Sequence, residues 1–241
     1  MTTPKKAPKG PHARGLPHRI WRVTKRVFLI LFILQFVYIF LLKWMNPPIT
    51  LTEIGSLLAG DGLRHTYVSM KDISPNAKLA VISTEDQLFP DHDGFDFKNI
   101  EKAMKHNQKS KSLHGASTIS QQVAKNVFLW QGRSWFRKGL EVYFTFMIEL
   151  VWGKKRILEM YLNVAEMGKG IYGIEAAAHT YYHIPAKNLN RIQAARIAAC
   201  LPNPKIYTVK PLSDHVAARS AWAVDQMSHL ESDPDIARLL Q

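Results

Sequence analysis

An uncharged, apolar run at Val27–Leu42 constrains this chain more than any other feature of its sequence. As a helix, the run spans about 24 Å, slightly less than the roughly 30 Å hydrocarbon core of a bilayer. Trp44 and Met45 extend it, and basic residues flank it on both sides. A helix that is apolar on every face is rarely a core helix of a soluble protein. The run therefore predicts a transmembrane helix over residues 27–45.

The residues that follow the run distinguish an anchor from a cleaved signal peptide. Cleaved signal peptides end in small residues of the Ala-x-Ala type, but residues 43–48 read Lys-Trp-Met-Asn-Pro-Pro. We therefore expect an uncleaved signal anchor that crosses the membrane once. Because basic flanks stay in the cytoplasm, residues 1–26 are predicted to form a basic cytoplasmic tail, and the chain beyond the anchor is predicted to lie on the other side.

The charge distribution argues against a nucleic-acid partner. A net charge of +13 is typical of proteins that bind nucleic acid. However, residues 1–43 hold nine of the 32 basic residues and none of the 19 acidic ones. Most of the excess charge therefore belongs to the N-terminal arm and not to a groove in the folded part.

The rest of the chain is interpreted as a juxtamembrane segment, residues 46–63, and one mainly α domain, residues 64–241. Apolar residues recur at helical spacing through most of this domain, and Arg64–Met70 is the best candidate for a strand. Gly168–Gly173 has the spacing of a dinucleotide-binding loop, but no parallel β-α-β unit surrounds it. We interpret this segment as a tight turn.

The stretch Glu85–Gly94 contains the first candidate for acid–base chemistry. Glu85 closes an apolar run that begins near Leu79, so its carboxyl group is expected at the edge of a packed interior. Such an environment raises the pKa of a carboxyl group towards neutrality and makes it a usable base or acid. A solvated turn is the alternative, because the stretch is rich in loop-forming Pro, Asp and Gly.

The stretch Gly115–Asn126 joins a loop of small residues to a predicted helix. Thr118 followed by Gln121 fits a capping box, which places the helix start at about Ile119. Free backbone N–H groups and the positive end of the helix dipole favour an anionic ligand at such a start. A capped, solvated helix end without a ligand is the alternative.

Glu141 follows in the next predicted helix, four residues after Arg137 and three after Lys138. A surface salt bridge of small energetic value is one interpretation. The other is a buried carboxylate that needs a partner or a function. Neighbouring aromatic residues, such as Phe144 and Phe146, favour the second interpretation because they predict a largely buried helix.

Four ordered motifs resemble those of the peptidoglycan glycosyltransferases. They are Glu85-Asp86-x-x-Phe89-x-x-His92-x-Gly94, Gly115-x-Ser117-Thr118-Ile119-x-Gln121-Gln122-x-x-Lys125-Asn126, Arg137-Lys138-x-x-Glu141 and Arg156-Ile157-Leu158-Glu159-x-Tyr161-Leu162-Asn163. Gly168–Ala178 is similar to the segment that follows them in that family. The chain is too short for an additional transpeptidase domain, so it resembles the monofunctional, membrane-anchored branch.

The resemblance implies a lysozyme-like, two-lobed fold in the bacterial cytoplasmic (inner) membrane, with the catalytic domain on the periplasmic side. The implied substrates are lipid II, a disaccharide-pentapeptide on a polyprenyl diphosphate, and the nascent glycan strand. The 4-hydroxyl of an acceptor sugar attacks C1 of the donor, the configuration inverts to a β-1,4 link, and polyprenyl diphosphate leaves. Membrane lipid and proteins of cell-wall synthesis or division are the other implied partners.

The resemblance also implies roles for individual residues. Glu85 is the expected general base, and Glu141 is the second catalytic carboxylate, which holds cations or a divalent metal, Mg²⁺ or Mn²⁺, at the diphosphate. The expected substrate-binding residues are Lys125, Arg133, Arg137, Ser117, Thr118, Gln121, Gln122, Asn126, Asp86, Phe89 and His92. The last three are expected to shape the first motif, and the fourth motif is expected to be scaffold. No metal-ligand spacing occurs among the ten histidines, so no metal-binding side chains are assigned.

Two other functions stay open at this point. A membrane-bound glycan hydrolase also uses paired carboxylates on a lysozyme-like fold, but it has no diphosphate to bind and little need for cations around Glu141. A non-enzymatic membrane anchor would use its basic arm to bind partners, and a Glu85→Gln variant would keep that function. For any shared site, Glu85 and Glu141 are expected to face one cleft, with Lys125 and Arg133 on its wall.

Overall fold

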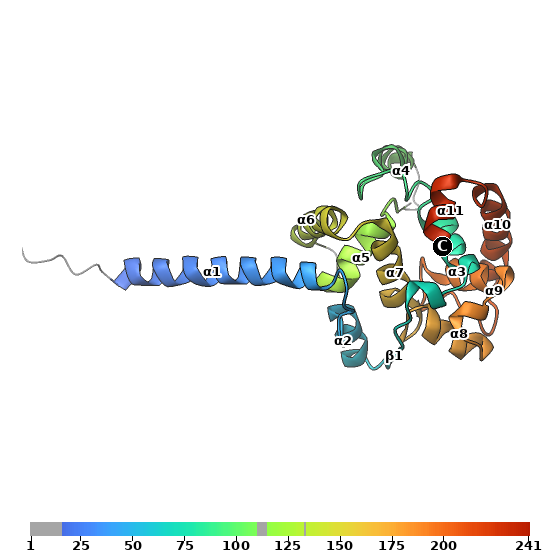
Figure 1. Ribbon diagram of the computed structural model, residues 1–241, viewed down its shortest axis with the longest axis horizontal. Coiled ribbons are helices and arrows are strands. Elements are labelled where there is room, and N and C mark those ends of the chain that lie inside the picture. The colour runs from blue at the N-terminus through green and yellow to red at the C-terminus, as the bar shows by residue number, and fades with distance from the viewer. Residues whose placement is uncertain (1–15, 110–114, 133) are drawn as a thin grey trace, which may run out of the picture. The chain divides into compact units, whose positions relative to one another are not determined.

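The computed structural model describes residues 16–109, 115–132 and 134–241, and it is mainly α, as predicted (Figure 1). The helices are α1 (Leu16–Leu41), α2 (Leu51–Leu58), α3 (Pro75–Glu85), α4 (Phe97–Lys109), α5 (Ile119–Phe128), α6 (Trp135–Val151), α7 (Lys154–Val164), α8 (Ile174–Tyr182), α9 (Arg191–Cys200), α10 (Asp214–Leu230) and α11 (Pro234–Leu240), with 3₁₀ turns at Met70–Asp72 and Ala186–Asn188. The strands are β1 (Arg64–His65), β2 (Glu166–Gly168) and β3 (Ile171–Tyr172).

Helix α1 is the one helix of the described chain that is long and apolar enough to cross a membrane, and the qualifying stretch is His18–Leu41. Helix α1 begins at Leu16, before the predicted span of residues 27–45, and it ends at Leu41, before the end of that span. The part of the predicted cytoplasmic tail before residue 16 lies outside the described residues. Residues 1–41 form one compact unit of the chain, and residues 42–241 form the other.

Within residues 42–241, the helices pack in two groups. Helix α3 packs against α9, α10 and α11, whereas α5 packs against α2, α6 and α7 (Figure 1). Every residue from Ala77 to Ser83 on α3 is buried. Burying apolar surface contributes about 25 cal/mol per Å², so α3 is held firmly up to its last turn, where Glu85 emerges.

The tight turn predicted at Gly168–Gly173 is present at residues 169–170, where it joins two strands of a small three-stranded sheet. Strands β2 and β3 pair antiparallel through this segment, and β1 pairs parallel with β3. Gly170 lies at the bend with a positive φ of 66°, and a side chain there would collide with the carbonyl of Asp61. The strand predicted over Arg64–Met70 is confined to its first two residues. Strands this short carry no alternation of apolar residues from which to predict them.

Two residues of the fourth motif hold other segments in place, which agrees with the scaffold role expected for them. Asn163 on α7 accepts the N–H of Val68 at 2.8 Å and donates to its carbonyl at 2.9 Å. The guanidinium of Arg156 donates to the carbonyls of Leu42 at 2.9 Å and Met45 at 2.7 Å. Helix α7 therefore fixes both the segment after residue 41 and the stretch that leads into α3.

Helix α6 differs from the largely buried helix that its aromatic residues predicted. One side is buried and carries Glu141 and Ile148. The other side is open, with Trp135 93%, Phe136 72% and Leu150 70% exposed. The aromatic residues were misinterpreted because a wide apolar stripe looks the same whether it faces a core or another apolar phase.

Candidate active site

Glu85 is the last residue of α3, and its half-buried carboxylate accepts a hydrogen bond from the Gln122 side chain on α5 at 2.8 Å. The amide oxygen of Gln122 accepts the Tyr161 hydroxyl at 3.2 Å. Burial raises the pKa of Glu85, and the hydrogen bond from Gln122 and the positive charge of Arg219 partly offset this rise. The carboxyl group thus has the environment that a general base needs near neutral pH.

The loop after Glu85 is held by its own polar residues. Asp86 accepts the N–H of Ile119 at 3.0 Å and a hydrogen bond from Nε2 of His92 at 3.0 Å. The N–H of Gly94 donates to Nδ1 of His92 at 3.1 Å, so the ring carries its proton on Nε2. Phe89 is fully buried. These side chains fix the loop geometry, in keeping with the shaping role predicted for them.

The predicted capping box at the start of α5 is present. Thr118 accepts the N–H of Gln121 at 3.2 Å, and the Gln121 side chain accepts the N–H of Thr118 at 3.0 Å. The Thr118 hydroxyl also donates to the carbonyl of Gly94 at 2.7 Å, which joins the first two motifs. Both side chains are engaged inside the protein, so their contact with substrate stays a prediction.

Glu141 is buried between two cations of α6. It accepts hydrogen bonds from Arg137 at 2.8 Å and from Lys138 at 2.5 Å, and it is only 3% exposed. The interpretation as a buried carboxylate is therefore the right one. The Nε of Arg137 is buried without a partner among the described residues. Arg133, the other predicted cation, lies outside them.

The donor set does not fit a metal ion held by the protein. The described part of the chain contains no group of three or more His, Cys, Asp or Glu side chains that could hold one. Glu141, the residue proposed for this task, has both carboxylate oxygens bound to cations. The positive charge available to an anionic ligand at this site therefore comes from the chain's own lysine and arginine side chains.

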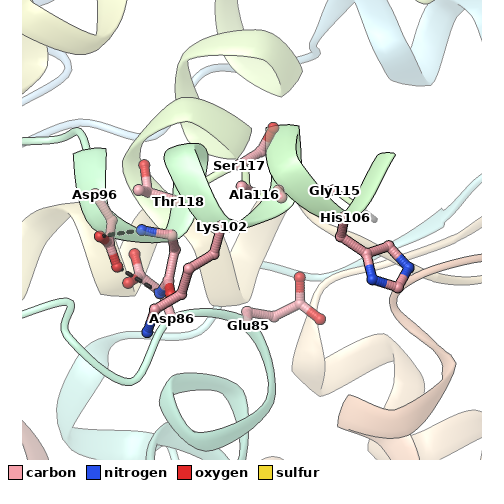
Figure 2. Close-up of a pocket in the computed structure, with 11 residues that line it drawn as sticks. Glu85, Asp86, Asp96, Lys102, His106, Gly115, Ala116, Ser117 and Thr118 are labelled. Carbon is pink, nitrogen blue, oxygen red and sulfur yellow. Dashed lines mark hydrogen bonds between the residues drawn. The ribbon is translucent and has the colours of Figure 1, made fainter. Parts of the chain in front are cut away.

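Within the described residues, three cavities border the site, and one of them, about 380 Å³, is lined by residues 83–88, Asn99, Lys102 and Trp222. The α4 cavity, about 390 Å³, is lined by Glu85, Asp86, Asp96, Asn99, Lys102, Ala103, His106 and Gly115–Thr118 (Figure 2). The α2 cavity, about 450 Å³, is lined by Thr52, Gly55, Ser56, Ala59, Gln122, Lys125, Asn126, Gln131, Tyr161, Ala165, Glu166, Tyr172, Leu201, Pro202, Pro204 and Lys205. Gln122 lines the α2 cavity and Glu85 lines the α4 cavity, so their hydrogen bond joins the walls of the two cavities.

The predicted residues line both the α4 cavity and the α2 cavity, whereas Glu141 lines neither of them. Ser117 joins Glu85 in the α4 cavity, whereas Lys125 and Asn126 line the α2 cavity. Burial lowers the pKa of Lys125, and the negative charge of Glu141 opposes this, with a smaller contribution from Glu85. Lys125 thus lies within electrostatic reach of both carboxylates.

Several residues at the site carried no signal in the sequence. Arg219 on α10 donates to the carbonyl of Thr84 at 3.3 Å and stacks on Trp222 with 3.6 Å between its guanidinium carbon and the ring centroid. Its position depends on the packing of α10 against α3, which no local pattern reveals. Glu166 and Lys205 line the α2 cavity, although neither belongs to a motif of the sequence.

We expect Glu141→Ala to lower the free energy of unfolding by about 3 kcal/mol, because it leaves Arg137 buried without its counter-ion. Urea denaturation followed by circular dichroism measures this change. The matched control is Glu101→Ala, which removes an exposed pair with Lys105 on α4 and is expected to cost about 0.5 kcal/mol or less. A Glu141→Ala variant as stable as the wild type would show that the buried pair contributes nothing.

Comparison with known proteins identifies the family of this chain. Residues 52–228 match the Transglycosylase family. The chain is 49% identical over 211 residues to the biosynthetic peptidoglycan transglycosylase of Haemophilus influenzae, which covers 86% of this chain and 84% of that one. For the proteins of the same name from Aeromonas hydrophila and Escherichia coli, identity is 45% over 220 residues (90% and 94% covered) and 56% over 169 residues (70% and 70%). The chain belongs to the transglycosylase family.

Proposed function

We propose that this protein polymerises the glycan strands of peptidoglycan, by transferring the growing chain from polyprenyl diphosphate to the 4-hydroxyl of lipid II. The observation that carries the proposal is that Glu85, a carboxyl group of raised pKa bound by Gln122, lies within electrostatic reach of Lys125. The names of the similar proteins, biosynthetic peptidoglycan transglycosylases, support the same class of reaction.

In this reaction, Glu85 takes the proton of the acceptor 4-hydroxyl while the oxygen attacks C1 of the donor. The bond between C1 and the diphosphate oxygen breaks, and the electron pair leaves with polyprenyl diphosphate. Attack from the face opposite the leaving group inverts the configuration from α to β. Lys125 stabilises the negative charge that develops on the diphosphate. Glu141 keeps Arg137 and Lys138 oriented for the same purpose.

A glycan hydrolase is not favoured. Hydrolysis of a neutral glycosidic bond releases no anion, whereas this site collects Lys125, Arg137 and Lys138 within electrostatic reach of one another. The raised pKa of Glu85 suits either reaction, so the discrimination rests on the cations. The names of the similar proteins also point to synthesis.

A membrane-bound location follows from the substrate and from the apolar surface of the chain. The apolar α1 is suited to anchor the protein, and its basic N-terminal flank places that end in the cytoplasm by the positive-inside rule. Exposed leucines on α2, including Leu58 at 85%, and the open side of α6 with Trp135 and Phe136 offer further surface to lipid. The catalytic domain then works on the periplasmic side, where glycan strands are assembled.

The direct test is the purified full-length protein in lipid vesicles with lipid II, followed by analysis of the products. The proposal expects a polymer that a muramidase cleaves into disaccharide units. A protein that leaves lipid II unchanged but shortens finished glycan strands would be a hydrolase. A protein that changes neither would be the non-enzymatic anchor.

The raised pKa of Glu85 predicts the acid limb of the rate profile. A base must be ionised, so kcat/KM should rise with pH about a midpoint above the ordinary glutamate value of about 4.3. Arg219→Gln should move this midpoint upward, because the positive charge of Arg219 lowers the pKa of Glu85. Initial rates between about pH 4 and 8 measure the shift. Arg238→Gln, at an exposed arginine paired with Asp235 on α11, is the control and should leave the midpoint in place. An unmoved or lowered midpoint in Arg219→Gln would contradict the assignment.

A further inference from the structure

The proposed transfer brings two anionic substrates to Glu85, and this inference rests on that proposed function. The donor releases its diphosphate, whereas the acceptor keeps its own diphosphate and also carries peptide carboxylates. The cations described so far are Lys125, which lines the α2 cavity, and the pair bound to Glu141. These cations balance the charge of the departing diphosphate. The anionic groups of the acceptor need a positive partner of their own.

The α4 cavity gives an acceptor a route to the base. Glu85 lines this cavity and also the one of about 380 Å³, and Lys102 lines both. A hydroxyl that enters from either cavity therefore meets a wall that carries both Glu85 and Lys102. One wall of the cavity is α4, which contributes Asn99, Lys102, Ala103 and His106. Figure 2 shows Lys102 and His106 on the same cavity as the carboxylate of Glu85.

The acidic residues of the α4 cavity already have hydrogen-bond partners. Asp86 accepts from Ile119 and His92. Asp96 accepts the backbone N–H of Asn99 at 2.9 Å and its side-chain amide at 2.5 Å. Neither carboxylate therefore needs a cation to satisfy its oxygens.

Lys102 differs from Lys105, on the same helix, in its ion pairs and in its place relative to the cavity. Lys105 pairs with Glu101 at 2.6 Å and lies outside the cavity. Lys102 lines the cavity, is exposed to solvent, and forms no hydrogen bond or ion pair with any residue that the structure describes. A lysine on the outside of a basic helix is ordinarily a solvated surface residue. A lysine that lines the same cavity as the reacting carboxylate is placed to bind an anionic group of the substrate.

We propose that Lys102 binds an anionic group of the acceptor substrate in the α4 cavity and thereby positions the acceptor 4-hydroxyl at Glu85. The anion is the diphosphate or a carboxylate of the peptide, because both are present on lipid II and both suit an ammonium group. Lys102 is a positioning residue, since it takes no part in the bonds that form and break.

The test measures one round of transfer from a preformed lipid-linked glycan strand to three acceptors. These are lipid II, the disaccharide-pentapeptide without diphosphate, and the lipid-linked disaccharide diphosphate without peptide. Lys102→Ala should raise KM for lipid II roughly fivefold with little change in kcat, the effect of one solvent-accessible charge contact. Lys102→Arg should restore most of the loss. Lys98→Ala, on the same helix but outside the cavity, should behave as the wild type.

The shorter acceptors identify the anion and separate binding from folding. If the penalty of Lys102→Ala disappears with the acceptor that lacks diphosphate, the diphosphate is the partner, and if it disappears with the acceptor that lacks peptide, the carboxylate is. A penalty of equal size with all three acceptors would mean a structural role, and no penalty at all would mean a solvated lysine; either result overturns the proposal. A wild-type protein that extends no acceptor would overturn the proposed function itself, and the inference with it.

Discussion

Replacing Glu85 by glutamine is expected to lower kcat for glycan polymerisation by about 10²–10⁴-fold, the contribution of a positioned general base. Glutamine keeps the shape of the side chain and can still accept the hydrogen bond from Gln122, which the carboxylate accepts at 2.8 Å. What it loses is the ability to take a proton from the acceptor hydroxyl. Binding of lipid II should be largely kept, because Lys125 and its neighbouring cations are untouched. Polymer length and amount on gels, with labelled lipid II, measure the loss.

The stability of the Glu85→Gln variant is the control for this experiment. Burial raises the pKa of Glu85 in the folded protein, so the folded state holds this proton more tightly than the unfolded state. The resulting stabilisation is present at low pH and is lost as pH rises through the raised pKa. A glutamine does not titrate, so at neutral pH the variant should be at least as stable as the wild type. Polymerisation by Glu85→Gln at the wild-type rate would remove Glu85 from the mechanism.

Replacing Lys125 by methionine is expected to lower kcat by about 10²–10³-fold, the range seen when one preorganised donor to a developing charge is removed. Methionine is similar in length to lysine, and it suits the buried position, where desolvation lowers the pKa of Lys125. The loss should appear in kcat more than in KM, because the charge on the diphosphate grows as the bond to C1 breaks.

Lys169→Met is the matched control for the Lys125 experiment. Lys169 is 64% exposed, pairs with Asp61 at 3.3 Å and does not line the α2 cavity, so its removal should leave kcat in place. A Lys125→Met variant that loses affinity for lipid II but keeps kcat would show that Lys125 only binds the ground state. That outcome would transfer the stabilising role to Arg137 and Lys138.

The parts of this molecule that could be predicted are those fixed by neighbouring residues. The capping box of Thr118 and Gln121 and the pairing of Arg137 with Glu141 depend on spacings of three and four residues, which a helix turns into contacts. The apolar run that ends in Glu85 likewise predicted a carboxyl group at the edge of a core. For these features, the local pattern and the tertiary structure agree.

The parts that could not be predicted depend on packing between distant segments. Arg219 reaches the end of α3 from α10, and Lys102 lines the same cavity as Glu85, although both look like ordinary surface residues of a helix. The α2 cavity lies between α5 and α2, and the α4 cavity lies between α4 and the loop before α5. The short strands around Gly170 were not predicted, because they are defined by their hydrogen-bonded partners in the sheet and not by their residue composition.

The amide of Gln122 is held at both ends, since its nitrogen donates to Oε2 of Glu85 and its oxygen accepts from Tyr161. In the proposed mechanism, Oε2 stays bound to Gln122, so Oε1 is the oxygen that takes the hydrogen of each incoming sugar. The two oxygens of the carboxyl group then have different roles, because Oε2 holds Gln122 and Oε1 exchanges protons. Each cycle of elongation would use the same oxygen of Glu85, without rotation of the side chain between cycles.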